Sequence, residues 1–305
     1  MLRPLWEPVL MGLSQRVVEA LRDLPPGVHE AVPADVRRGI RHRLGRFYAW
    51  EAGYDHHHTP VPAADEESGP PGFVGIGVQK AGTSWWHRLI IDHPQVSDRP
   101  SIHKERHFFA RFGAEQFTAT DVADYHAWFP RKIGTITGEW TPDYFAYPWV
   151  PPLMARAAPD TRLLVILRDP VQRFRSGLAH QIRNGADHVG SSQAEALGRS
   201  LYADSLRRWR ANFPAEQLLV LQYEQCVADP SGQLARTYAH LGLDEGHRPA
   251  DLTGEVNKTV EGKADLPADA RARLEEIVAA DIADLTTQLP EFDFSLWTST
   301  KGGAA

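Results

Sequence analysis

The chain lacks three features, and each absence excludes a class of protein. It has one cysteine, Cys226, so it cannot form an internal disulfide, which is typical of a reducing compartment and predicts a cytoplasmic protein. It has no apolar run of about 18 residues, so we expect no transmembrane segment. Its N-terminus carries Glu7 and no small-residue cleavage site, which argues against a signal peptide.

The chain also lacks the positive charge that would attract nucleic acid. Its 305 residues hold 33 Lys and Arg against 39 Asp and Glu, a net charge of −6 at pH 7. We therefore expect no nucleic-acid partner, and any anion site must come from locally placed basic residues. The 42% hydrophobic and 24% charged residues are ordinary for a soluble globular protein. Oligomeric state stays open.

Residues 1–72 are predicted to form a helical N-terminal extension and a linker. Residues 1–50 fit two helices, and residues 51–72 are rich in Pro, Gly, Asp and Glu. Three consecutive histidines at 56–58 cannot all point at one metal, so we interpret them as a solvated loop. The helical segment packs on the body, binds a membrane surface or a partner, or covers a binding site, and the pattern does not choose among these.

From residue 73 onward, strands and helices alternate. We predict strands at 73–78, 134–138, 162–168 and 217–222, and helices at 84–92, 148–158, 170–184, 200–212, 231–241 and 267–288. Short, wholly apolar strands such as 163–167 belong in a parallel sheet covered on both faces. The predicted fold class is therefore α/β, a P-loop-like parallel sheet with helices on both faces, preceded by the helical N-terminal segment.

Residues 75–83 are the most informative segment. They follow an apolar run and precede an apolar-periodic segment, which predicts a strand, a glycine-containing turn and a helix start that present backbone N–H groups to an anion. Gly77 and Gly82 have the spacing of a P-loop, but Thr83 stands where a nucleoside triphosphatase has lysine. The lysine lies earlier, at Lys80, where it reaches the first phosphate beside the loop. The loop therefore predicts a nucleotide with a short anionic chain rather than ATP.

A second anion-binding element follows the strand at 162–168. Arg168 ends this buried strand, and a Pro-initiated helix comes next. Because ligands bind at the carboxyl ends of strands in open α/β sheets, we expect Arg168 to face a crevice, with Ser176 supplying a hydroxyl to the same phosphate. The alternative is a structural pair of Arg168 with Asp169. A magnesium-binding Walker aspartate would stand directly at the strand end, and here that position holds arginine.

Residues 102–109 place one carboxylate among basic groups. Glu105 lies between Lys104 and His107 and precedes two phenylalanines. One interpretation is a general base held ionised by its neighbours, and the other is a charged surface turn anchored by the aromatics. Further along, Trp140 and Tyr144 fit either the lining of an acceptor pocket or the core.

Together these elements resemble the sulfotransferases that use 3′-phosphoadenosine 5′-phosphosulfate (PAPS), of the carbohydrate type related to heparan sulfotransferases. Residues 77–84 match that family's 5′-phosphosulfate loop, residues 167–170 with Ser176 match its 3′-phosphate element, and residues 104–109 resemble the segment that carries its catalytic glutamate. The resemblance implies that residues 73–305 form a PAPS-dependent sulfotransferase domain. Such an enzyme moves a sulfuryl group to a hydroxyl of a sugar-containing or other small-molecule acceptor, releases PAP and needs no metal.

The resemblance also implies roles for the matching residues. Glu105 would take the acceptor's proton, and Lys80 would neutralise the leaving oxygen. The predicted site comprises catalytic Glu105, Lys80 and His107, donor-binding Lys80, Ala81, Gly82, Thr83, Ser84, Arg168, Ser176 and Lys263, and acceptor-binding Lys104, Trp140 and Tyr144.

Two departures from the family pattern bear on the substrate. Many relatives have a lysine where this chain has Trp140, so a flat ring or a less charged sugar is favoured over a polyanionic glycan. Residues 257–263 replace a Lys-Gly-Arg-type loop, and Lys258 or Lys263 fills its role, with Lys263 favoured. The alternative functions are a P-loop kinase acting on a small molecule and a catalytically silent PAP-binding module.

Overall fold

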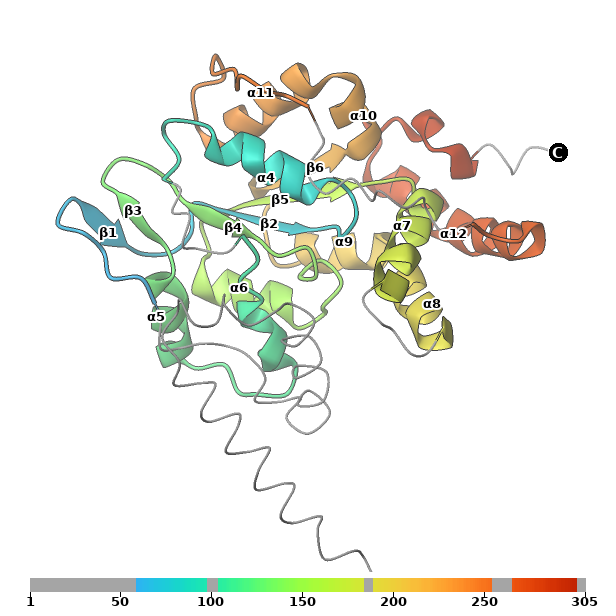
Figure 1. Ribbon diagram of the computed structural model, residues 1–305. Helices are drawn as coiled ribbons and strands as arrows, with labels where there is room; N and C mark the ends of the chain where they lie inside the picture. Colours follow the sequence, from blue (N-terminus) through green and yellow to red (C-terminus); the bar gives the residue numbers. More distant parts are fainter. Residues whose placement is uncertain (1–58, 98–103, 184–188, 254–264, 301–305) are drawn as a thin grey trace, which may run out of the picture. The chain divides into compact units, whose positions relative to one another are not determined.

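The computed structural model describes residues 59–97, 104–183, 189–253 and 265–300 (Figure 1). The chain divides into two units, Met1–Asp55 and His56–Ala305, and all described residues lie in the second. The N-terminal helices, the histidines at 56–58, Lys258 and Lys263 lie outside the described residues. The domain boundary at residue 72 stays a prediction. In the part of the chain that is described, no helix has the length and apolar character needed to cross a membrane.

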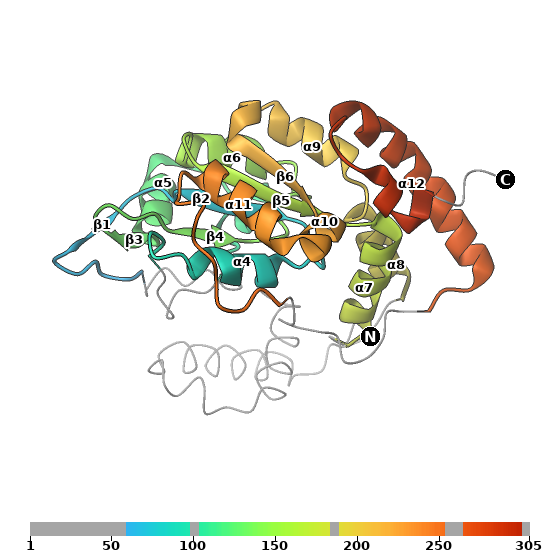
Figure 2. The same ribbon diagram turned by 90° about the horizontal axis from the view of Figure 1, so that it is seen from above.

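A four-stranded parallel sheet lies at the centre of the second unit. Its strands, in spatial order, are β4 (Gly138–Trp140), β2 (Phe73–Gly77), β5 (Arg162–Leu167) and β6 (Leu218–Gln222). Every residue of β2 is buried, and so is every residue of β5 after Arg162, because helices cover both faces of the sheet. Helices α4 and α11 lie over one face, and α6 and α9 lie over the other (Figure 1); Figure 2 looks down on the layer that contains α4 and α11. The predicted α/β fold with a parallel sheet is confirmed.

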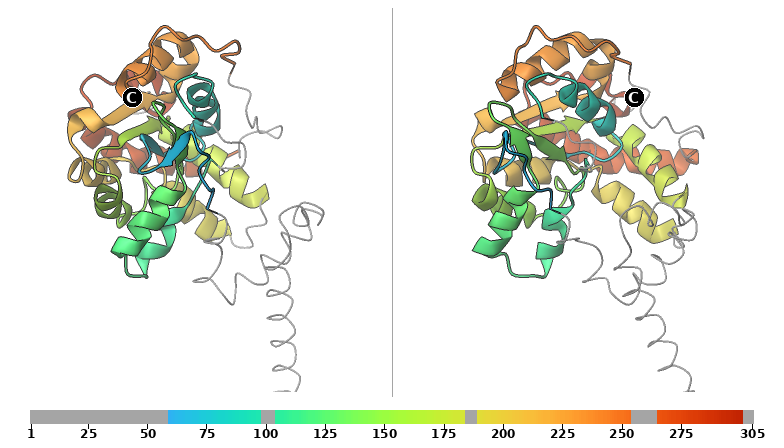
Figure 3. Two further views of the ribbon diagram at one scale, coloured as in Figure 1. Left: turned by 90° about the vertical axis from the view of Figure 1, so that its left-hand side faces the viewer. Right: turned by 60° about the vertical axis from the view of Figure 1, so that its left-hand side comes forward.

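The helices of the described residues surround this sheet. The α-helices are α4 (Thr83–Ile91), α5 (Ala119–Ala127), α6 (Val150–Ala157), α7 (Pro170–Arg183), α8 (Val189–Gly198), α9 (Ala203–Arg210), α10 (Tyr223–Ala228), α11 (Pro230–Leu241) and α12 (Ala268–Gln288). Short 3-10 helices are η2 (Phe108–Gly113), η3 (Ala215–Gln217), η4 (Phe294–Leu296) and η5 (Thr298–Thr300). A separate antiparallel pair, β1 (Glu66–Ser68) with β3 (Pro130–Lys132), lies at one edge of this unit (Figures 1 and 3).

Several predicted bounds need correction. The strand expected at 134–138 is instead β4, because Gly134 adopts φ 85° in a turn and Ile136 makes only an isolated bridge to Val96. The helix expected from residue 200 begins at Ala203. Cys226 lies in α10 and is fully buried, and burial raises the pKa of its thiol.

Candidate active site

Residues 77–84, the predicted 5′-phosphosulfate loop that we call the donor loop, join β2 to α4 at the carboxyl end of the sheet. Lys80 and Gly82 both lie in the left-handed region, with φ of 71° and 81°, and Gly82 is the N-cap of α4. Glycine adopts this conformation freely, whereas a lysine there is an uncommon backbone state of the kind found at functional sites. Thr83 and Ser84 follow in the first turn of α4, where backbone N–H groups remain open to an anion.

Two arginines donate hydrogen bonds to this loop: Arg168, which directly follows β5, and Arg173, which lies near the start of α7. Arg168 donates from Nη1 to the Lys80 carbonyl at 2.7 Å, and its guanidinium lies 4.5 Å from the centre of the Tyr223 ring. Arg173 is 1% exposed and donates to the Gln79 backbone carbonyl at 3.0 Å and to the Gln79 side-chain oxygen at 3.2 Å. Burial lowers the pKa of Arg173 to about 10, which leaves it charged at neutral pH. The shape of the loop therefore depends on side chains far away in the sequence.

Lys104, Glu105 and His107 form a connected group that we call the base cluster. The Lys104 Nζ donates to the Ser84 hydroxyl at 3.0 Å and lies 2.9 Å from Glu105 Oε1. The other carboxylate oxygen, Oε2, lies 3.4 Å from His107 Nε2. Lys104 thus connects the carboxylate directly to the start of α4, and the sequence-predicted loop and base segment are side by side.

The base cluster keeps its carboxylate ionised. Burial alone would raise the pKa of Glu105, but the hydrogen bond from His107 and the charge of Lys104 outweigh it and lower the pKa to about 2. The pKa of His107 is raised, first by its hydrogen bond to Glu105 and further by the charge of Asp143. Burial, aided by the charge of Lys104, lowers the pKa of His87 to about 3, so this nearby imidazole stays neutral.

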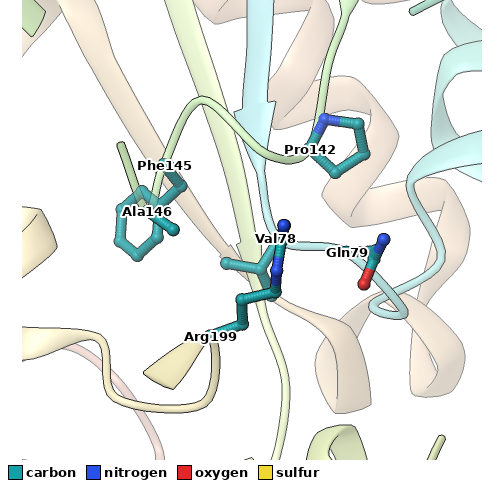
Figure 4. A pocket seen from close by; sticks show the side chains of 6 residues that line it. All are labelled: Val78, Gln79, Pro142, Phe145, Ala146 and Arg199. Carbon is teal, nitrogen blue, oxygen red and sulfur yellow. The ribbon is translucent and has the colours of Figure 1, made fainter. Parts of the chain in front are cut away.

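A small pocket separates the donor loop from the turn after β4 (Figure 4). It is lined by Val78, Gln79, Pro142, Phe145, Ala146 and Arg199. Arg199 forms an ion pair with Asp143, whose Oδ2 lies 3.8 Å from His107 Nδ1. The pocket therefore adjoins both the donor loop and the base cluster. Sequence reasoning missed Asp143 and Arg199, because nothing in the local pattern pairs residues so far apart.

Trp140 and Tyr144 do not line an acceptor pocket, and that prediction is wrong. Both side chains are fully buried. The Trp140 ring covers Gly75, where an added Cβ would overlap the ring, and its Nε1 donates to the Gly77 carbonyl at 3.3 Å. The glycine of β2 thus makes room for a core tryptophan, and the core interpretation of both aromatics holds.

The other predicted residues have these positions. Ala81 is buried within the loop, and Ser176 lies half-buried in α7, which begins where β5 ends. Their contacts with a donor, like that of Lys263, stay proposals. Among the described residues, no three His, Cys, Asp or Glu side chains gather in a way that would hold a metal ion. Independence from metal stays a prediction as well.

Comparisons with known proteins bear on this arrangement. Residues 117–246 match the Sulfotransferase family. The chain is 32% identical over 205 residues to heparan sulfate glucosamine 3-O-sulfotransferase 3B1 of Mus musculus, covering 61% of this chain and 50% of that protein. It is 31% identical over 207 residues to heparan sulfate glucosamine 3-O-sulfotransferase 6 of Homo sapiens, covering 61% and 58%. The chain spans about half the length of the curated relatives it matches.

A solved structure agrees at the level of the fold. The crystal structure of a sulfotransferase from Alicyclobacillus acidocaldarius aligns with a TM-score of 0.61 at 24% identity, covering 74% of this chain and 98% of that chain. Together with the sequence matches, this supports the resemblance: residues 117–246 match the Sulfotransferase family, the relatives matched by sequence are heparan sulfate sulfotransferases, and the fold is that of a solved sulfotransferase.

The comparisons overturn the predicted cytoplasmic location. The matching relatives are named for heparan sulfate, which is an extracellular or Golgi glycan and not a cytoplasmic substrate. The prediction rested on a single cysteine. A lone cysteine excludes an internal disulfide but does not assign a compartment.

Proposed function

We propose that this protein transfers a sulfuryl group from PAPS to a hydroxyl of a sugar-containing acceptor. The observation that carries the proposal is the link through Lys104, which bonds both the Glu105 carboxylate and the Ser84 hydroxyl at the end of the donor loop. Sulfuryl transfer needs a proton acceptor close to the donor, in a fixed orientation. The family match and the names of the relatives support this reaction and a carbohydrate acceptor.

The residues at the carboxyl end of the sheet fit the anionic groups of PAPS. The loop offers the Lys80 ammonium, the Thr83 and Ser84 hydroxyls and the N-terminus of α4 to the 5′-phosphosulfate. Arg168 and Ser176 are proposed to hold the 3′-phosphate. PAPS itself supplies an activated sulfuryl group, so the protein's task is positioning and charge stabilisation.

In this mechanism Glu105 is the general base. As the acceptor oxygen bonds to sulfur, the bond between sulfur and the bridging oxygen of the 5′-phosphate breaks, and the acceptor's proton passes to Glu105. Lys80 stabilises the charge on the leaving oxygen.

The contacts that keep Glu105 ionised also weaken it as a base. Because Lys104 bonds Ser84 as well, an anion bound in the loop competes for this lysine and restores the basicity of Glu105.

The acceptor is proposed to approach on the side of the small pocket next to Asp143 and Arg199. The pocket lies between Gln79 of the donor loop and the residues that follow β4. The charge of Arg199 is already neutralised by Asp143, and Trp140 occupies the core where many relatives are expected to have a lysine. A sugar of low charge is therefore proposed to approach the base cluster beside this pocket in preference to a polyanionic glycan.

The test is transfer from radiolabelled PAPS to three acceptors assayed in parallel: heparan sulfate, unsulfated heparosan and a neutral oligosaccharide. We expect label in at least one saccharide, both with magnesium and with EDTA. Strictly magnesium-dependent phosphoryl transfer from ATP would instead support the P-loop kinase. Tight PAP binding with no transfer to any acceptor would support the silent PAP-binding module.

A further inference from the structure

Glu139 is a carboxylate in the middle of β4 with no exposed surface. Its Oε2 accepts hydrogen bonds from the Arg106 backbone N–H at 3.1 Å and from the Thr141 hydroxyl at 2.6 Å. Its Oε1 accepts from the Tyr125 and Tyr144 hydroxyls at 2.8 and 3.3 Å. Such a complete set of donors is what a buried carboxylate requires.

The donors to Oε2 lead to the base cluster. Arg106 is the residue between the proposed base and its histidine, so its N–H fixes the backbone between them. The Thr141 hydroxyl, while donating to the carboxylate, accepts from the His107 backbone N–H at 3.2 Å. The next contact is the Trp140 N–H, which donates to the Lys104 carbonyl at 2.8 Å. The backbone of the cluster is thus tied to the end of β4 along its length.

These hydrogen bonds between β4 and the base cluster stabilise an uncommon backbone conformation. His107 adopts φ 52°, a left-handed state that a non-glycine residue keeps only when its surroundings hold it there. The side-chain spacing in the cluster depends on that backbone state. An apolar residue in β4 would pack without the desolvation cost of a buried charge, so packing alone does not account for a glutamate at this position.

We propose that Glu139 is a positioning residue: with Thr141 as its intermediary, it fixes the backbone of the base cluster and so sets the spacing between Glu105 and His107. The catalytic consequence rests on the proposed function, in which Glu105 is the base. The effect on the spacing between Glu105 and His107 does not rest on the proposed function, because the pKa of the His107 imidazole reports that spacing directly. The carboxylates facing that imidazole are Glu105 and Asp143, with Glu139 acting from further away.

The test uses two substitutions of Thr141 in the full chain. Thr141→Val has nearly the same shape and changes no charge, but it removes both bonds of the hydroxyl, whereas Thr141→Ser keeps the hydroxyl. The His107 imidazole is titrated by NMR, with its signal assigned from its loss in His107→Gln. We expect its pKa to fall toward 6.5 in Thr141→Val, because the imidazole moves away from Glu105, and to stay raised in Thr141→Ser.

Two further variants separate position from charge. Glu139→Gln should also lower the pKa of His107, but this substitution removes a negative charge as well. The result for Thr141→Val therefore takes precedence when the two variants disagree or when Glu139→Gln does not fold. Tyr125→Phe is the matched control, since it removes a bond to the same carboxylate from Oε1, the oxygen that makes no contact with the cluster backbone. It should leave the pKa of His107 unchanged.

Activity provides the second readout. With the acceptor that gives label in the PAPS assay, Thr141→Val should lower kcat about 10- to 100-fold with little change in the KM for PAPS, and Thr141→Ser should restore kcat. An unchanged His107 pKa in Thr141→Val overturns the positioning role, whatever the activity. A shifted pKa in a protein whose wild type transfers no label supports the positioning role and contradicts the proposed function.

Discussion

The Arg168 guanidinium donates a hydrogen bond to the backbone carbonyl of Lys80 at 2.7 Å. This bond connects the end of β5 to the donor loop, so the two elements that the proposal assigns to the two ends of PAPS are mechanically linked. Arginine has five N–H donors, and the Lys80 carbonyl takes one of them. The contact is therefore compatible with a second role for Arg168 toward the 3′-phosphate.

Replacing Arg168 tests this double role. Arg168→Met keeps much of the aliphatic part of the arginine side chain but removes its hydrogen bond to the Lys80 carbonyl and the proposed phosphate contact. A charge-assisted hydrogen bond contributes about 1.5–3 kcal/mol, so we expect PAP affinity to fall roughly 10- to 150-fold in calorimetric titrations. Arg162→Met is the matched control, because Arg162 lies at the opposite end of β5 and bonds the Glu216 carbonyl. Equal PAP affinity in both variants would contradict the assignment.

His87 makes the fold sensitive to acid. Its pKa is about 3 in the folded chain and 6.5 in the unfolded chain, so between these values the unfolded chain binds the extra proton. Stability is therefore retained above pH 6.5 and lost as the pH falls toward 3. Glu105 acts in the same direction at lower pH, since its stabilising effect is present above 4.5 and lost toward 2. Urea midpoints measured from pH 7 to pH 4 should decline less in His87→Gln; identical slopes would show that His87 is not the cause.

Trp140→Lys restores the residue expected in many relatives and distinguishes a core role from a binding role. Because the indole fills the space above Gly75, the substitution should lower the free energy of unfolding by about 3–5 kcal/mol, as for other large aromatic truncations. It should not improve transfer to heparan sulfate. A stable variant with enhanced transfer to that polyanion would show that the side chain reaches the acceptor after all.

Local signals made the sheet and the donor loop predictable. The strands β2 and β5 are continuous apolar runs, which is what a parallel sheet buried on both faces requires, and Gly77 and Gly82 mark the turn between strand and helix. The strand β4 was misplaced because three residues carry little periodicity. The pairs β1–β3 and Asp143–Arg199 depend on partners distant in sequence, which no local pattern reveals.

The aromatic residues show a different limit. Composition does not tell whether Trp140 lines a pocket or fills the core, since both environments favour tryptophan. A signal was nevertheless present: Gly75 inside a strand indicates close approach by another group, and that group is the indole. Glu139 carried no such signal, because the strand was predicted to end at residue 138, and its burial and its hydrogen-bond donors follow only from the structure.

In the proposed reaction, Glu105 removes the acceptor's proton beside a donor held by the loop. The measurement that tests it most directly compares wild type and Glu105→Gln for transfer from radiolabelled PAPS and for PAP affinity by calorimetry. In Glu105→Gln, transfer should fall by about 10²- to 10⁴-fold, the usual contribution of a general base, while PAP affinity is unchanged. Full turnover by Glu105→Gln would contradict this role of Glu105.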